Sequence, residues 1–272
     1  DVTGVQTCAL PICCTRRDDM IRKHVRGTRA ILGAVAALVA APAAVVAQSG
    51  GEGFLFNQPR VTVSIRSGYA LPRAGSDIYD HTISQLTIDR GDFASGYFGG
   101  EIAARLTNRL DLALGAGYSS SSTQSEFRDW VDGDDLPIEQ TTDLSTTALT
   151  LSAKYYLTNR GRSVGRFAWI PTKFNAFVGA GVGITNFDFL QRGDWVDFET
   201  FDVFNTKYRS NGATGSTHAF AGLDMSLTKN LFLTGEGRYS WAKGDLDRYH
   251  FEGFEKMDLS GLQLSIGISA RF

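Results

Sequence analysis

The sequence predicts an all-β fold: one antiparallel, up-and-down, eight-stranded transmembrane β-barrel, preceded by a signal peptide. Three observations support this prediction. The stretch 259–272 alternates apolar with polar residues, seven earlier stretches repeat that alternation, and three strands end in nearly the same four residues. Strict period two over such a stretch is longer than in an ordinary soluble strand.

The final stretch indicates which side of the predicted wall is apolar. One parity consists of Leu262, Leu264, Ile266, Ile268, Ala270 and Phe272, and the other of Gly261, Gln263, Ser265, Gly267, Ser269 and Arg271. A strand with one apolar face and one small, polar face is typical of a barrel wall that has lipid outside and polar groups inside.

The composition agrees with strands rather than helices. The chain has 272 residues, of which 30 are Gly and 6 are Pro, and its mean hydropathy is −0.12. Glycine is costly in helices, and a membrane barrel tolerates a low mean hydropathy because only every second strand residue meets lipid. After residue 47, no apolar run approaches the ~20 residues of a membrane-spanning helix.

All three cysteines lie before residue 47, so a disulfide scaffold and a Cys-built zinc site are excluded from the rest of the chain. That rest carries 21 Lys and Arg against 26 Asp and Glu. Nothing in this balance indicates a nucleic-acid partner.

The front of the chain has the three-part layout of a secretory signal peptide. A basic segment from Met20 to Arg29 precedes an apolar run, and small residues, Val45 and Ala47, stand at positions −3 and −1 of the expected cleavage site. We expect residues 20–47 to be the signal peptide, cleaved after Ala47, and 48–272 to be the barrel domain. Residues 1–19 resemble translated sequencing-adapter read-through and are treated as non-native upstream sequence.

Eight strands are expected in the barrel domain. They cover 60–71, 96–106, 110–121, a strand ending at 157, 174–187, 216–227, 231–241 and 259–272. The repeated ends are Leu106–Arg109, Leu157–Arg160 and Leu227–Asn230, and they fall at the three places where such a barrel connects strands on the side of its termini. The other four connections, 72–92, 122–140, 188–215 and 242–256, are expected to be polar outer loops.

The inward parity carries charge. The residues expected to point into the lumen are Arg66, Glu101, Arg105, Asp111, Lys154, Asp224, Glu236 and Arg238. Eight strands enclose an interior only wide enough for side chains to fill, so these charges have to pair with one another. We expect a polar plug; the alternative is a gated water path.

Aromatic residues are expected to form two girdles at the membrane interfaces. The turn-side set is Tyr155, Phe174 and Phe272, and the loop-side set is Tyr69, Tyr118, Tyr239 and Trp241. Sheet propensity alone would explain their presence but not their position near strand ends.

No motif indicates catalysis, a metal or a cofactor. The segment Gly179–Gly183 has strict period two and no following helix, so it is expected to be a glycine-lined strand rather than a nucleotide loop. The acidic segment Asp129–Asp135 misses the calcium-loop spacing. The three histidines of the barrel domain, His81, His218 and His250, are not beside a Ser or Glu in a recognisable triad.

On these residues the chain resembles the small OmpA- and OmpX-type bacterial outer-membrane barrels over essentially all of 48–272. The resemblance implies location in the outer membrane of a Gram-negative bacterium, in contact with lipid and lipopolysaccharide. It also implies that Phe272 belongs to the signal read by the barrel assembly machinery.

Two functional hypotheses are consistent with this interpretation. The first is a non-enzymatic structural or surface-interaction barrel that acts through its outer loops. The second is a transporter or narrow channel for small solutes, as in OmpW-like relatives. A rival fold, a soluble lipocalin-type barrel, would place the apolar parity inward around a ligand.

Overall fold

The computed structural model describes residues 55–165, 167–197, 200 and 202–272. The predicted upstream segment and the predicted signal peptide with its cleavage site at Ala47 lie outside these residues. The described residues belong to the barrel domain.

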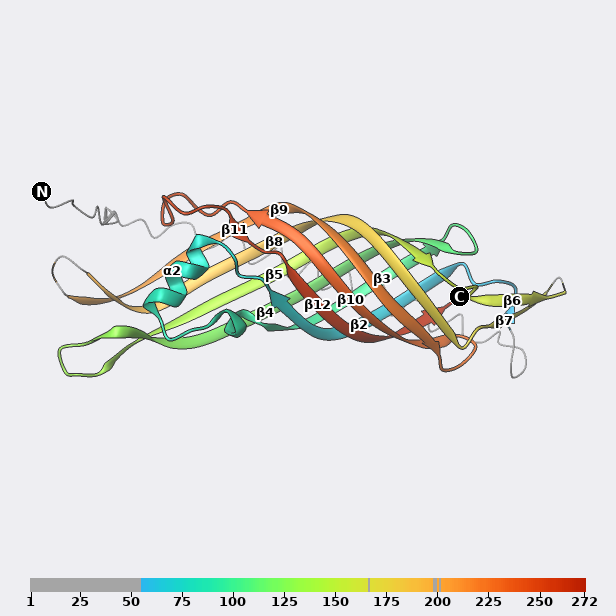
Figure 1. Ribbon diagram of the computed structural model, residues 1–272, viewed down its shortest axis with the longest axis horizontal. Helices are drawn as coiled ribbons and strands as arrows, with labels where there is room; N and C mark the ends of the chain where they lie inside the picture. The colour runs from blue at the N-terminus through green and yellow to red at the C-terminus, as the bar shows by residue number, and fades with distance from the viewer. Residues whose placement is uncertain (1–54, 166, 198–199, 201) are drawn as a thin grey trace, which may run out of the picture. The chain divides into compact units, whose positions relative to one another are not determined.

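Eight antiparallel strands close into a barrel (Figure 1). They are β2 (Val61–Pro72), β3 (Ser95–Arg105), β4 (Leu110–Val131), β5 (Pro137–Tyr156), β8 (Phe174–Val196), β9 (Val203–Ser226), β10 (Leu231–Gly244) and β12 (Gly261–Arg271). Each strand pairs with the next in sequence, and the pairing of β12 with β2 closes the ring. The predicted all-β fold, an antiparallel up-and-down eight-stranded barrel, is therefore confirmed; the signal peptide predicted before it stays a prediction.

The two ends of the barrel carry different additions. A small sheet of β1 (Leu55–Phe56), β7 (Ala168–Pro171) and β6 (Gly161–Val164) lies at the end that holds the short connections, which we call the turn side. The helix α2 (Asp77–Gln85), the 3-10 helix η3 (Arg90–Phe93) and the short strand β11 (Met257–Asp258) lie at the other end, the loop side.

Threonine explains the repeated turn sequence. At the β3–β4 turn, the Thr107 Oγ1 accepts hydrogen bonds from the main-chain N–H of Arg109 and Leu110 at 3.2 and 3.0 Å. At the β9–β10 turn, Thr228 Oγ1 does the same for Asn230 and Leu231 at 3.3 and 3.0 Å. A side-chain acceptor of this kind satisfies donors that the turn leaves unpaired.

The outer face of the barrel wall is apolar. Among the exposed side chains on this face are Ile65, Leu112, Leu114, Leu149, Leu151, Val178, Val182, Leu223, Leu264, Ile266 and Ile268. Soluble monomers rarely expose so large an apolar surface. It excludes the lipocalin alternative, which required these residues to face inward.

The predicted outer loops 122–140 and 188–215 are mostly strand, which corrects the sequence-based boundaries. Strands β4, β5, β8 and β9 continue far past the apolar wall and end in two long hairpins. Along β8 the alternation reverses its polarity: Ile184 faces outward, but beyond it Phe187 and Phe189 are buried inside while Asp188 lies on the outer face. An outer face that turns polar belongs in water, so the reversal marks the membrane surface.

A hydrophobic core fills the loop-side end of the barrel. Its buried members include Ile78 and Tyr79 of α2, Phe93 of η3, Phe127 of β4, Ile138 and Leu144 of β5, Phe187 and Phe189 of β8, Phe251, and Met257 of β11. The connection 72–92, predicted to be a polar loop, thus folds back as a lid over the barrel. Burial, with the nearby Asp258 carboxylate, raises the pKa of Tyr79, so its phenol stays neutral.

We predict that Phe189→Ala loosens the loop-side hairpins without opening the membrane-spanning wall. Phe189 is fully buried and its ring meets Phe251 at 6.0 Å, and removing such a ring costs about 3–5 kcal/mol. Hydrogen exchange should accelerate in 122–140 and 188–209 and remain slow in β12. The control Leu190→Ala, on the outer face, should leave exchange unchanged. Equal effects of both variants would show that the buried loop-side core does not stabilise the hairpins.

Candidate functional site

The centre of the lumen holds a layer of four charged side chains, which we call the ion layer. Arg66 Nη2 lies 2.5 Å from Glu101 Oε2, and Arg66 Nη1 lies 2.5 Å from Glu236 Oε2. Arg238 Nη2 lies 2.9 Å from Glu236 Oε1 and 3.7 Å from Glu101 Oε2. Two cations and two anions therefore balance within the layer.

All four side chains of the ion layer are at most 8% exposed. They come from three strands, β2, β3 and β10, of which β2 and β10 are separated by β12. Opposite Arg66 on β12 stands Gly267, where a Cβ would come within 2.5 Å of the Arg66 Cγ. The glycine leaves the room in which the Arg66 side chain crosses the lumen.

A second charged group lies toward the turn side. Arg160 Nη1 donates to Asp111 Oδ2 at 2.6 Å, and its other nitrogens donate to the carbonyls of Asn108 and Thr107 at 3.3 and 3.0 Å. Arg105 faces Asp111 in the strand register, as expected. Its guanidinium, however, donates to main-chain carbonyls, among them Pro59 O at 3.2 Å, and Arg160 takes its place as the partner of Asp111.

The remaining two predicted lumen charges use other contacts. The Lys154 Nζ lies 3.7 Å from the centre of the Phe177 ring, a cation–π contact. Asp224 accepts hydrogen bonds from Thr234 Oγ1 at 2.8 Å and from Tyr156 Oη at 3.2 Å. Both side chains are buried in the lumen, and Arg105 is half-buried at its rim.

A serine–histidine pair also lies in the lumen. Ser152 Oγ and His218 Nε2 are 2.8 Å apart, and both residues are buried. Within the described part of the chain, no carboxylate is hydrogen-bonded to His218, so the pair has no third member of a triad. Gly181, from the predicted glycine-lined strand, makes room for the His218 ring, whose Nε2 would lie 2.7 Å from a Cβ there.

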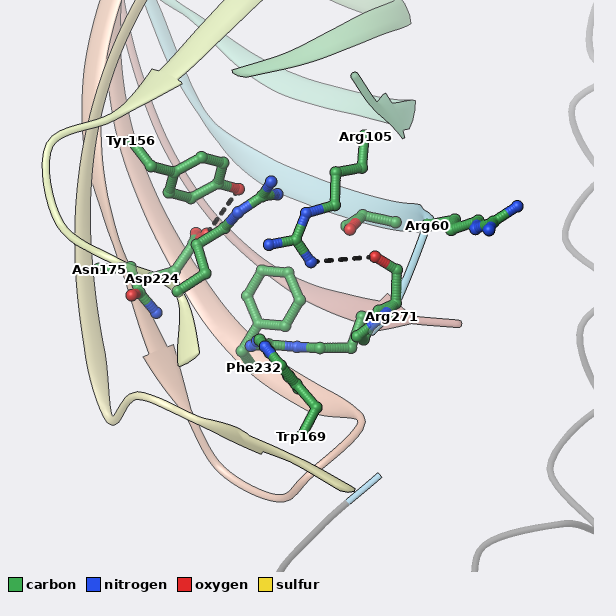
Figure 2. Close-up of a pocket in the computed structure, with 11 residues that line it drawn as sticks. Arg60, Arg105, Tyr156, Trp169, Asn175, Asp224, Phe232 and Arg271 are labelled. Atoms are coloured by element: carbon green, nitrogen blue, oxygen red, sulfur yellow. Dashed lines mark hydrogen bonds between the residues drawn. The ribbon is translucent and has the colours of Figure 1, made fainter. Parts of the chain in front are cut away.

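Cavities lie above and below the ion layer. One of about 110 Å³ lies between it and the loop-side lid, and one of about 40 Å³ touches Arg66, Arg238 and His218. A third, of about 20 Å³, lies at the turn-side end near Arg105 and Arg271 (Figure 2). The lumen thus consists of small chambers separated by side chains.

Most aromatic residues of the two predicted girdles are exposed on the outer face: Tyr69, Tyr118 and Trp241 of the loop-side set, and Tyr155 and Phe174 of the turn-side set. Charge inside, with aliphatic and aromatic side chains outside, is the pattern of a wall that spans a bilayer. This is a membrane-spanning β-barrel of the outer-membrane type. Single-chain barrels of this kind occupy bacterial outer membranes, which locates this protein.

No family model and no curated protein matches the sequence. Solved structures match along most of the chain. Neisserial surface protein A is 12% identical with a TM-score of 0.45, covering 78% of this chain and 97% of that one. The outer membrane protein OprG from Pseudomonas aeruginosa is 15% identical with a TM-score of 0.45, covering 80% and 99%. The E. coli outer membrane protein W is 15% identical with a TM-score of 0.35, covering 79% and 100%.

Among the described residues, no helix is long and apolar enough to cross a membrane, and no group of His, Cys, Asp and Glu could hold a metal ion.

The acidic segment Asp129–Asp135 forms the end of the β4–β5 hairpin, where Asp132 Oδ1 accepts main-chain hydrogen bonds from Asp134 and Leu136.

Among the lumen residues that sequence reasoning missed are Arg160, Arg271 and Trp169. Arg160 and Trp169 belong to the middle turn-side connection, for which the sequence predicts an extended turn, whereas the chain forms the β6–β7 hairpin there. Arg271 lies on the inward parity of the last strand, and that parity is the signal that could have placed it among the lumen charges.

We predict that Glu236→Gln destabilises the barrel by about 3–5 kcal/mol, because it leaves Arg66 and Arg238 buried with one carboxylate between them. Urea unfolding in lipid vesicles measures the change. The matched control is Asp188→Asn, which removes an exposed pair with Arg209 on the outer face and should cost about 1 kcal/mol or less. A loss for Glu236→Gln no larger than for the control would show that the ion layer is not a stabilising element.

Proposed function

We propose that this protein is a non-enzymatic outer-membrane barrel whose role is structural or surface-interacting, with a lumen closed by its own side chains. The observation that supports this most is the ion layer: Arg66, Glu101, Glu236 and Arg238 meet across the lumen within hydrogen-bond or ion-pair distance. On the loop side of the ion layer lies the hydrophobic core with its lid, and on the turn side lies the β6–β7 hairpin.

The surface that such a protein would offer to a partner is formed by the two long hairpins. Their outer faces carry ordered charge pairs, Arg209 with Asp188 and Arg192 with Asp143, the latter at 3.5 Å. Because each hairpin continues barrel strands, these side chains stand on rigid strands rather than on loops. We propose lipopolysaccharide headgroups and the surfaces of other proteins or cells as partners of these hairpins.

Membrane conductance tests the closed lumen. We predict that the parent protein in planar bilayers shows no large steady channels and that Glu236→Gln shows none either, because glutamine keeps the side-chain volume. The double variant Arg66→Ala/Arg238→Ala removes two large side chains from the ion layer and should conduct, which verifies insertion. Sizeable steady channels in the parent protein would refute the plug.

One observation favours the second candidate function, transport of small apolar solutes. The 110 Å³ cavity is lined by inward residues such as Tyr97 and Thr146 and also by Leu71, Tyr118 and Leu262, which belong to the outer face. A solute could thus pass between this chamber and the lipid.

Uptake into vesicles distinguishes the two functions. If the protein transports apolar solutes, Ala148→Phe, which fills the cavity wall, should abolish uptake, whereas Ala153→Phe on the outer face should not. If the role is structural, neither the parent protein nor the control gives uptake above that of empty vesicles.

A further inference from the structure

The turn-side mouth of the barrel has an excess of positive charge around a small cavity. Four arginines, Arg60, Arg105, Arg160 and Arg271, line the 20 Å³ cavity, whereas Asp224 is its one acidic lining residue among those the structure describes. Figure 2 shows the guanidinium groups of Arg105 and Arg271 on either side of the Phe232 ring, with Trp169 below.

Arg60 is exposed to solvent, and of the other three arginines, Arg105 and Arg271 form no ion pair with a carboxylate. Arg160 is neutralised by Asp111 at 2.6 Å. Arg105 donates to main-chain carbonyls, and Arg271 Nη2 donates to Ser226 Oγ at 3.1 Å. Within the described ranges, no Asp or Glu oxygen lies within 4.0 Å of either guanidinium. Asp111 acts on Arg105, and Asp224 on Arg271, only at longer range. A buried cation such as Arg271 that lacks a close ion-pair partner is costly.

Two buried N–H donors at the same cavity also lack an acceptor within the described part of the chain. They are Arg271 Nε and Trp169 Nε1, and their residues are 5% and 2% exposed. Both guanidinium groups lie over the Trp169 ring, with Arg105 Cζ at 5.9 Å and Arg271 Cζ at 5.8 Å from the ring centre. A buried donor without a partner costs about 1–3 kcal/mol, so these groups at one place share the same need for an acceptor.

We propose that this cavity binds one small monovalent anion, with the size of a halide ion or a single carboxylate group, through Arg105, Arg271 and Trp169. A cavity needs about 10–15 Å³ to hold one water molecule, so 20 Å³ accommodates one small ion. A water molecule would accept the N–H donors but would leave both guanidinium groups without a counter-charge at contact distance, whereas an anion supplies one.

The anion has a structural consequence at the turn side. Trp169 belongs to β7, Arg105 ends β3 and Arg271 ends β12. One ion bound to all three connects the β6–β7 hairpin with two strand ends that are not its neighbours in the barrel. The hairpin then becomes a closure of the turn-side mouth that is held in place by the anion.

Halide titration of the full barrel in detergent tests the site. Chloride-35 NMR line broadening should saturate at constant ionic strength, formate should compete, and crystals soaked in bromide should show one anomalous peak beside Trp169. Arg105→Gln and Arg271→Gln should each weaken binding at least tenfold, and Trp169→Phe, which keeps the ring and removes the donor, should weaken it several-fold.

The matched control is Arg162→Gln, an exposed arginine on the same hairpin, which should bind as the parent does. If Arg271→Gln does not fold, the halide affinity of Arg105→Gln, whose side chain is only half-buried at the rim, is the measurement that tests the site. The absence of saturable broadening in the parent protein would show that the cavity holds water only. An equal loss in Arg162→Gln would show that surface charge is responsible; either result overturns the proposal.

Discussion

The need of charged groups inside a narrow barrel to pair with one another constrains most of this structure. Arg66 is the clearest case, because its guanidinium meets carboxylates from β3 and from β10 at 2.5 Å each. These strands lie on opposite sides of β2 in the closed ring. The Arg66–Glu101 pair joins neighbouring strands, whereas the Arg66–Glu236 pair connects β2 with β10, which shares no main-chain hydrogen bonds with it. A shift of one strand by one residue would turn the carboxylates toward lipid. The ion layer therefore fixes register as well as closing the lumen.

The barrel wall meets lipid along its turn-side part and water along its loop-side part. In the turn-side part the strands have apolar residues outside and polar residues inside, and in the loop-side part this order reverses. Along β5, Leu149 and Leu151 face outward, whereas Leu144 and Ile138 are buried. The turn-side part has the residue pattern of a membrane barrel, with apolar residues outside. The loop-side part has the pattern of a soluble protein, with apolar residues buried in a core of its own beneath α2 and η3. The part of this protein that extends beyond the membrane on the loop side is thus built mainly from barrel strands.

The sequence was informative where lipid imposes a simple rule. Eight strands, their inward and outward parities and the two tight turns follow from period two and from the repeated Thr turns, and parity alone places the eight charges inside. The rule fails beyond the membrane. The sequence predicts a strand end at Phe187 because the apolar residues there change sides, yet the backbone of β8 continues to Val196. The helix α2 was missed because its polar residues outnumber Ile78 and Tyr79, and only the barrel interior gives those two a place to be buried. The partner of Asp111 was missed because Arg160 lies after the end of β5 and reaches the lumen from outside the regular strands.

The direction of the side chains on β12 tests the membrane-barrel assignment most directly. The chain has no cysteine after residue 47, so single cysteines placed at positions 262–270 can each carry one spin label in lipid vesicles. We predict a period of two: labels at 262, 264, 266, 268 and 270 are accessible to oxygen dissolved in the bilayer, and labels at 263, 265 and 269 are accessible neither to oxygen nor to a water-soluble nickel complex. Accessibility with the opposite phase, or the nickel complex reaching the even positions, would contradict the assignment.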